Sequence, residues 1–329
     1  MPIVSASSIA SAALALSKGD VVAMPTETVY GLAGRIDLPQ ALEKIFLIKQ
    51  RPFFDPLIIH VESKTQARDL TTDWNELTDF LADCFWPGPL TMVVPKSHTV
   101  DPLITSGLES VGLRCPRHPL ALQLLKKVGV PLAAPSANRF GRTSPTSPQH
   151  VKDEFPDNDL LILDGGPCDV GIESTVLKIE KKDDLYQLFI LRKGLITQQM
   201  IEEKLSRKNL KFHFLEALDK SASPGHLEHH YMPSIPLIFC LNPAQTPKIL
   251  LDRLIGQNKI QTSFGEIGIL KLSNEAAMAA RQLYSELRRL SEKNYDALVF
   301  YKEEWQNSEA WQAIVDRIYR ASLIKVLLE

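Results

Sequence analysis

The sequence predicts an α/β protein with two domains: a twisted mixed sheet with helices, followed by a smaller α/β domain. Three observations support this prediction. Helix and strand signals alternate over residues 1–205, a turn-rich stretch at 206–234 lacks a clean period, and the alternation restarts over 235–329. A chain of 329 residues is also longer than a single hydrophobic core usually grows, which favours two domains.

Five helices are expected before residue 206, from apolar residues at helical spacing and from the residues that end each run. The first has Ser7 or Ser8 as its N-cap and Gly19 as its C-cap, and the second ends before Pro52. In chain order, we expect helices near 8–16, 42–48, 77–84, 118–128 and 197–205.

Short apolar runs between these helices predict the strands of the sheet. In chain order, we expect strands at 20–24, 57–61, 90–94, 111–114, 131–134, 160–163, 175–179 and 185–191. The last part of the chain fits a small Rossmann-like α/β domain. In that domain we expect strands at 236–241, 266–271 and 297–301 and helices near 247–255, 275–290 and 308–319.

Charge and cysteine content exclude several classes of function. The 37 basic and 39 acidic residues give a net charge of −2 at pH 7, which argues against a general binder of nucleic acid or anionic membrane. The four cysteines form no C-x-x-C pair, so we predict neither a disulfide framework nor a zinc site and expect a cytoplasmic location. No apolar run approaches the roughly 20 residues that span a bilayer.

The common catalytic motifs do not occur. The sequence has no P-loop, no G-x-G-x-x-G, no H-E-x-x-H and no G-x-S-x-G. His226, His229 and His230 suggest a metal site, but no acidic or cysteine partner stands at ligand spacing. A solvated or hydrogen-bonding linker is the favoured interpretation of these histidines, and no metal site is predicted.

Six polar segments remain, most of them at the ends of expected strands, where ligands of α/β sheets usually bind. They are residues 25–31, 49–51, Arg114, 134–138, 171–175 and 191–194. Segment 25–31 places two hydroxyls and a carboxylate after a buried strand, although it also suits the N-cap of a following helix.

Cations dominate two of these segments. Lys49 and Arg51 follow a helix, where they complement the helix dipole or carry the charge of a bound anion. Arg114 lies in an otherwise apolar strand, and it must be paired or bind an anion because a buried unpaired charge is costly. Together the segments suit a phosphate ester and a small carboxylate bound side by side, handled by positioning and electrostatics more than by covalent catalysis.

The order of these segments resembles the YrdC-type threonylcarbamoyl-AMP synthase family in its long, two-domain form. The motifs that carry the resemblance are Thr26-Glu27-Thr28-Val29-Tyr30-Gly31-Leu32, Lys49-x-Arg51-Pro52, Pro56-Leu57-Ile58-Ile59-His60, Trp86-Pro87-Gly88-Pro89-Leu90-Thr91, Pro135-Ser136-Ala137-Asn138 and Gly171-Ile172-Glu173-Ser174-Thr175. The resemblance implies a YrdC-like catalytic domain at 1–205, a linker reaching toward the active site at 206–234, and a small C-terminal domain at 235–329.

The resemblance also implies a reaction. The family joins L-threonine, bicarbonate and ATP into threonylcarbamoyl-adenylate and releases pyrophosphate, so the chain is expected to be a nucleotidyltransferase. A downstream tRNA threonylcarbamoyl transferase machinery would use the product to modify the adenosine next to the anticodon of certain transfer RNAs. Mg²⁺ is implied with the triphosphate, although no dedicated carboxylate cage is visible in the sequence.

The family's site residues carry over onto matching positions. For L-threonine they are Thr28, His60, Arg114, Ala134 and Ser174. For ATP they are Arg51, Asp55, Ser110, Ser136, Ser144 and Arg192. The catalytic set is Lys49, Arg51, Ser136 and Asn138, in which the two cations would carry phosphate charge and the other two residues would orient phosphate or carbamate oxygens.

The sequence departs from the family pattern at two places. Position 55 is Asp where the family often has an amide, and a carboxylate there would repel a triphosphate unless it binds magnesium or turns away. The linker has Leu227 where the family commonly has a lysine, although His230 and Tyr231 stay candidates to reach the site.

Two alternative functions stay open. The first is an RNA- or nucleotide-binding module without turnover, in which a local cleft contacts tRNA weakly; the net negative charge gives it little support. The second is a carbamoyl transferase of hydrogenase maturation. Such proteins carry zinc-finger-like cysteine pairs and an acylphosphatase module, which do not occur in this sequence.

Overall fold

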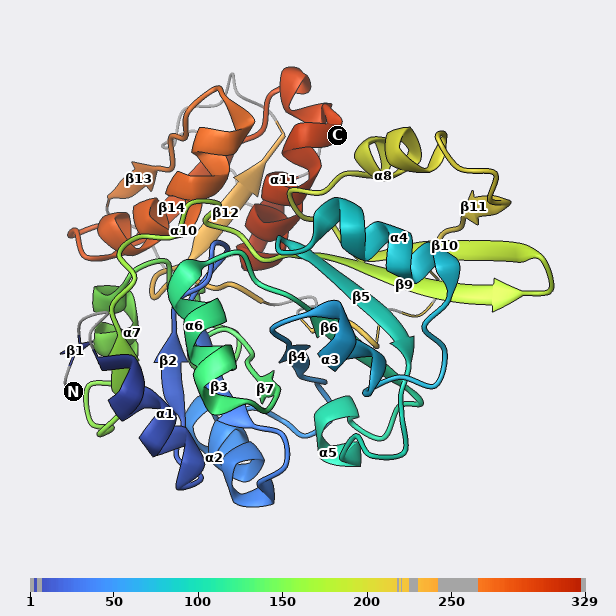
Figure 1. Cartoon of the computed structure of the whole chain (residues 1–329). Coiled ribbons are helices and arrows are strands. Elements are labelled where there is room, and N and C mark those ends of the chain that lie inside the picture. The colour runs from blue at the N-terminus through green and yellow to red at the C-terminus, as the bar shows by residue number, and fades with distance from the viewer. Residues whose placement is uncertain are drawn as a thin grey trace. The chain divides into compact units, whose positions relative to one another are not determined.

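The computed structural model describes residues 3–4, 8–217, 219, 221–224, 230–241 and 266–326 of the chain. The chain divides into two compact units, each with its own sheet (Figure 1). The first unit comprises Met1–Phe140 and Ser144–His226, and the second comprises Gly141–Thr143 and Leu227–Glu329. The stretch expected as a linker is therefore divided between the two units at residue 226.

The sheet of the first unit contains eleven strands within the described residues. They are β1 (Ile3–Val4), β2 (Val22–Met24), β3 (Gly31–Arg35), β4 (Ile58–His60), β5 (Leu90–Pro95), β6 (Ser110–Arg114), β7 (Leu132–Ala133), β8 (Leu161–Leu163), β9 (Thr175–Lys182), β10 (Leu185–Arg192) and β11 (Phe212–Phe214). Their order is β1-β8-β2-β3-β7-β4-β6-β5-β9-β10-β11. Parallel pairs such as β4 with β6 stand beside antiparallel pairs such as β5 with β6, so the predicted mixed sheet is confirmed.

Helices pack on both faces of this sheet. The helices of the first unit are α1 (Ile9–Ser17), α2 (Pro39–Lys49), α3 (Lys64–Arg68), α4 (Glu76–Phe85), α5 (Pro102–Thr105), α6 (Pro119–Val128), α7 (Pro148–Glu154) and α8 (Gln198–Leu205). In β2, Val22 and Met24 pack with α1 and α6, whereas Ala23 between them packs with α2. Successive strand residues point to opposite faces, so helices cover both sides. A third cluster buries α4 and α8 against β5, β9 and β10.

Several short elements were not expected from the sequence. Segment 25–31 does not cap a helix: it continues into β3, which pairs antiparallel with β2 and β7, so the N-cap interpretation is wrong. The sequence of β3, Gly-Leu-Ala-Gly-Arg, has low strand propensity, and its two neighbours supply the pairing. Within the turn-rich stretch, β11 pairs parallel with β10 and thereby belongs to the first unit's sheet.

The second unit has a parallel sheet of its own. Its described strands are β12 (Leu237–Cys240), β13 (Ile267–Ile269), β14 (Ala297–Tyr301) and β15 (Ile324–Val326), in the order β13-β14-β12-β15. Helices α10 (Ala276–Ser291) and α11 (Glu309–Ala321) follow β13 and β14 and confirm the second α/β domain. The helix expected at 247–255 lies outside the described residues.

Candidate active site

Arg114 ends β6 and is almost completely buried. Its Nη2 lies 2.7 Å from Glu27 Oε1, its Nη1 donates to Thr28 Oγ1 at 2.9 Å, and its Nε donates to the Gly88 carbonyl at 3.2 Å. The expectation that a buried strand arginine must be paired is met by Glu27. Two of its five N–H donors are used in hydrogen bonds, to Thr28 and Gly88, whereas Nη2 meets Glu27 as an ion pair without a hydrogen bond. N–H donors on both Nη1 and Nη2 are therefore left for another acceptor.

The loop of residues 25–31 holds its own shape through Thr26. The Thr26 hydroxyl donates to the Val29 carbonyl at 2.6 Å, accepts from the Val29 amide, and shares a hydrogen bond of 2.8 Å with the Thr28 hydroxyl. The Thr28 carbonyl in turn accepts from Gly171 N at 3.2 Å, which brings segment 171–175 beside the loop. Two of the predicted segments, far apart in the sequence, are thereby adjacent.

Ser174 and Arg192 form a second group in the same unit. The Ser174 hydroxyl shares a hydrogen bond of 2.7 Å with Thr91 Oγ1 and accepts from Arg192 Nη2 at 3.1 Å. Arg192 Nε also donates to the Ser174 carbonyl, and its Nη1 donates to the Pro224 carbonyl at 3.1 Å. Gly194 permits this close approach, because a Cβ there would lie 2.3 Å from the backbone nitrogen of Thr175.

Lys49 joins the end of α2 to segment 134–138. Its Nζ donates to the Ser136 carbonyl at 2.5 Å and to the Asn138 carbonyl at 2.6 Å. Complete burial, followed by the nearby charge of Arg51, lowers the pKa of Lys49 well below its ordinary value. The lysine therefore holds the Ser-x-Asn segment in shape, whatever else it binds.

Arg51 and Asp55 form a buried ion pair. Arg51 Nη2 lies 2.9 Å from Asp55 Oδ2 and donates to the Pro56 carbonyl at 2.7 Å. Asp55 has no exposed surface and Arg51 is 7% exposed. The carboxylate expected to repel a triphosphate thus has its charge balanced by the neighbouring arginine.

His60 ends β4 directly opposite Arg114 in the parallel register. Burial, followed by the positive charge of Arg114, lowers the pKa of His60 from 6.5 to about 3. The imidazole is therefore neutral at physiological pH.

The neutral His60 predicts a loss of stability in acid. Because its folded pKa, about 3, lies below the ordinary 6.5, the unfolded chain binds more protons between these values. The contribution to stability is fully present above pH 6.5 and falls as the pH is lowered, by about 2 kcal/mol at about pH 5. Urea unfolding measures the unfolding free energy at about pH 8 and at about pH 5. Between these two pH values, this free energy should fall by about 2 kcal/mol less in His60→Gln than in the wild type. Equal losses in both proteins would contradict a neutral His60.

Three further predicted residues lie elsewhere in the first unit. Ser144 is buried and donates to Glu173 Oε1 at 2.6 Å, and Ala134 N donates to the Ile58 carbonyl at 3.0 Å. Ser110 begins β6, the strand that Arg114 ends. Glu27 and Glu173 belong to two of the sequence motifs, but the sequence predicts no role for them, because a motif does not tell which side chain faces inward.

The two linker candidates belong to the second unit. The His230 and Tyr231 rings meet edge to face with centroids 4.2 Å apart, and Tyr231 stacks on Tyr284 at 5.8 Å. That these residues reach the site in the first unit stays a prediction. Positions 226, 227 and 229 lie outside the described residues.

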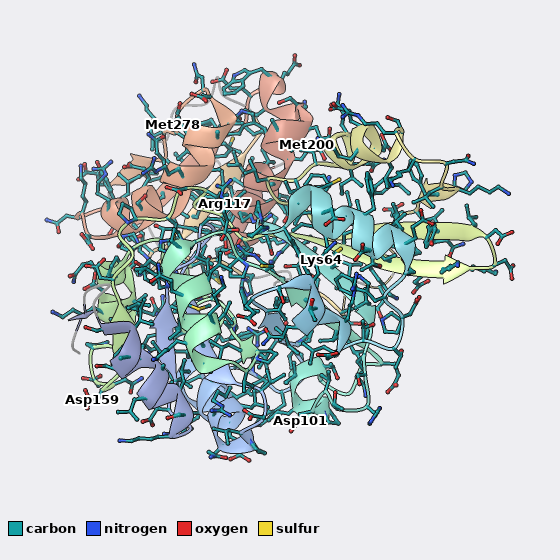
Figure 2. All side chains as sticks on the ribbon, in the orientation of Figure 1. Lys64, Asp101, Arg117, Asp159, Met200 and Met278 are labelled. Carbon is teal, nitrogen blue, oxygen red and sulfur yellow. The ribbon has the colours of Figure 1, made fainter. Side chains whose placement is uncertain are left out.

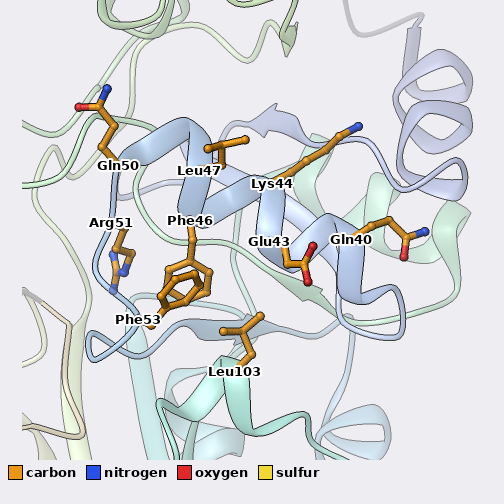
Figure 3. Close-up of a pocket in the computed structure, with 9 residues that line it drawn as sticks. All are labelled: Gln40, Glu43, Lys44, Phe46, Leu47, Gln50, Arg51, Phe53 and Leu103. Carbon is orange, nitrogen blue, oxygen red and sulfur yellow. The ribbon is translucent and has the colours of Figure 1, made fainter.

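A pocket of about 770 Å³ lies beside α2 in the first unit. It is lined by Gln40, Glu43, Lys44, Phe46, Leu47, Gln50, Arg51, Phe53 and Leu103 (Figure 3). Of the predicted site residues only Arg51 is among them, and the Phe46 and Phe53 rings pack together with centroids 4.8 Å apart. None of the residues expected to bind L-threonine lines this pocket.

Two classes of feature are missing from the described part of the chain. There, no group of three or more His, Cys, Asp or Glu residues is arranged to hold a metal ion. None of the helices described there combines the length and apolar character needed to cross a membrane.

Comparisons with known proteins cover almost the whole chain. The Sua5_yciO_yrdC family model, described as "Telomere recombination", matches residues 14–194, and the model "Threonylcarbamoyl-AMP synthase, C-terminal domain" matches residues 196–322. A threonylcarbamoyl-AMP synthase of Bacillus subtilis is 35% identical and covers 95% of this chain and 92% of its own length. One from Pyrococcus abyssi is 34% identical, with 95% and 93% covered.

A solved structure has the same fold over the same extent. The crystal structure of P. abyssi Sua5 complexed with L-threonine aligns with a TM-score of 0.83 and 31% identity, and covers 99% of this chain and 100% of that one. The likeness therefore extends over both units and not only over the unit that holds the motifs.

Proposed function

This chain belongs to the threonylcarbamoyl-AMP synthase family, and we propose that it makes threonylcarbamoyl-AMP and pyrophosphate from L-threonine, bicarbonate and ATP. It is an enzyme that forms an adenylate, as its relatives' name indicates. The observation that carries the choice of substrates is Arg114: a buried guanidinium with N–H donors left on Nη1 and Nη2, beside hydroxyls and a neutral histidine.

Threonine is proposed to bind with its carboxylate on Arg114. A carboxylate accepts two parallel hydrogen bonds from a guanidinium, and the hydrogen bonds of Arg114 to Thr28 and Gly88 leave N–H donors on both Nη1 and Nη2. Because His60 is uncharged, Arg114 supplies the positive charge that the carboxylate of threonine meets. Thr28, Ala134 and Ser174 complete the proposed threonine site.

ATP is proposed to bind beside the threonine site, with cations at the ends of α2 and β10 carrying its phosphate charge. The proposed contacts are Arg51, Ser110, Ser136, Ser144 and Arg192, with Asn138 orienting phosphate or carbamate oxygens. Lys49 supports this site by holding the Ser136 and Asn138 carbonyls, and a bound triphosphate would favour its protonated form. Asp55 is proposed to hold Arg51 and not to touch phosphate.

The reaction needs little help from a strong side-chain base. The threonine amine and bicarbonate condense to a carbamate with loss of water. A carbamate oxygen then forms a bond to the α-phosphorus of ATP, and the bond from that phosphorus to the bridging oxygen breaks, releasing pyrophosphate. The protein's part is to align carbamate and phosphate, balance their charge and exclude water.

Mg²⁺ is proposed to arrive with ATP and to neutralise phosphate charge. The buried carboxylate of Asp55 is paired with Arg51, and no group of three or more His, Cys, Asp or Glu among the described residues could hold a metal ion, so these residues fit no dedicated magnesium cage. The product is proposed to pass to a transferase machinery that modifies the adenosine next to the anticodon of transfer RNA.

Pyrophosphate release by the purified protein tests the proposal. With ATP and magnesium present, threonine and bicarbonate are left out one at a time. Release that requires both supports the synthase reaction. Release with threonine alone in carbonate-free buffer points to plain amino-acid adenylation. No release from the folded protein, together with salt-dependent tRNA binding, favours a binding module.

A further inference from the structure

We propose that Glu27 is a positioning residue that fixes the Arg114 guanidinium for the carboxylate of the amino-acid substrate. The proposal rests on the proposed function, because it requires that Arg114 binds that carboxylate. It adds a residue whose effect on threonine is indirect: Glu27 acts on Arg114, and Arg114 acts on the substrate.

The contact between the two side chains is close and shielded from water. Glu27 Oε1 lies 2.7 Å from Arg114 Nη2, and the two residues are 1% and 4% exposed. A buried arginine without an anion would be costly and would turn toward solvent or another acceptor. Glu27 supplies that anion before any substrate arrives, so the guanidinium has one orientation in the empty site.

The other atoms of Glu27 are held as firmly as the one that meets Arg114. Its Oε2 accepts from Arg117 N at 3.1 Å, and its own carbonyl accepts from Val170 N at 2.8 Å. Arg117, labelled in Figure 2, follows the strand that Arg114 ends. Glu27 therefore joins three segments that are distant in the sequence: the loop after β2, the end of β6 and segment 170–175.

This arrangement decides which donors of Arg114 stay available. Hydrogen bonds to Thr28 and Gly88 occupy one N–H each, and the Glu27 carboxylate lies against Nη2. The orientation that keeps all three contacts also sets the direction of the N–H groups left on Nη1 and Nη2. Loss of the Glu27 charge removes one of the three contacts that hold the planar guanidinium, so the whole group can shift about its hydrogen bonds to Thr28 and Gly88. The substrate carboxylate would then meet a guanidinium that is still present but poorly aligned, which weakens a bidentate contact.

The test compares L-threonine with L-threoninol, in which a hydroxymethyl group replaces the carboxylate. For the wild type, kcat/KM should favour threonine by about 10- to 150-fold, the worth of a charged hydrogen bond. In Glu27→Gln this preference should fall about tenfold, through a higher KM for threonine, with the KM for ATP unchanged. Asp37→Asn is the matched control, because Asp37 also pairs with an arginine, Arg35 at 2.6 Å, but on the surface. It should keep the full preference.

A merely structural role for Glu27 gives a different result. Activity on both substrates would then fall by the same factor, the preference would be retained, and the proposal would be overturned. Glu27→Asp keeps the charge but shortens the side chain by one methylene, so it retains a buried counterion for folding if Glu27→Gln is unstable. An intermediate preference in Glu27→Asp supports the proposal, and an undiminished one contradicts it.

The pose of threonine and the role of Glu27 are tested separately. A wild type that uses threonine and threoninol equally well removes the carboxylate contact itself, and with it the proposed pose of threonine. A different result removes only the role of Glu27. In that case the wild type prefers threonine, Arg114→Lys loses the preference, and both Glu27 variants keep it, so the contact between Arg114 and the threonine carboxylate is retained.

Discussion

Replacing Arg114 by lysine or alanine is expected to lower kcat/KM for threonine by about 10- to 150-fold while leaving the KM for ATP nearly unchanged. Lysine keeps a positive charge for Glu27 but lacks the planar fork that contacts a carboxylate through two N–H groups. Alanine in addition strands the buried Glu27 carboxylate, so its unfolding free energy must be measured alongside its kinetics.

Steady-state kinetics with each substrate varied in turn check this expectation. Arg35→Lys and Arg35→Ala are matched controls, since Arg35 pairs with Asp37 at a site where its side chain is 20% exposed. They should leave threonine use unchanged. If the folded Arg114→Lys protein had the threonine dependence of the wild type, the proposed threonine site would be wrong.

Replacing Arg51 by methionine is expected to destabilise the protein by about 3–5 kcal/mol and to raise the KM for ATP strongly. The cause of the instability is Asp55, which has no exposed surface and lies 2.9 Å from the guanidinium that would be lost. A second change, Asp55→Asn, removes the stranded charge. The double variant should recover most of the unfolding free energy but not the affinity for ATP.

Urea unfolding and ATP kinetics of the two single variants and the double variant separate these effects. Asp55→Asn alone should lower the unfolding free energy less than Arg51→Met does, because Arg51 keeps its hydrogen bonds to the Asp55 and Pro56 carbonyls. A double variant as unstable as Arg51→Met would contradict the stranded-charge explanation. One with a normal KM for ATP would remove Arg51 from the proposed ATP site.

The long elements of the fold could be predicted from the sequence because their signals are local. Helix α6 begins at a proline after His118, whose ring accepts from Leu120 N, and it ends at Gly129 with φ +71°. Strand β3 could not be predicted in this way. Its Gly31, Ala33 and Gly34 disfavour a strand, and the stabilising partners are β2 and β7, the latter nearly a hundred residues away.

The candidate site was predicted as a set of residues but not as a set of contacts. The need of Arg114 for a partner was visible from its apolar neighbours, whereas the identity of that partner, Glu27, depends on the folding of a loop 87 positions earlier in the chain. Lys49 was expected to carry phosphate charge. The structure gives its ammonium two carbonyl acceptors beyond residue 135, which no local pattern reveals.

The nucleotide product that the protein forms from ATP, L-threonine and carbon-13 bicarbonate should be identified by its mass. If the site joins all three substrates, the product is an adenylate that carries the threonylcarbamoyl group and one heavy carbon. The same mass should vanish when threonine or bicarbonate is omitted. An adenylate of threonine without the heavy carbon, or ATP recovered unchanged from folded protein with every substrate present, would contradict the proposed reaction.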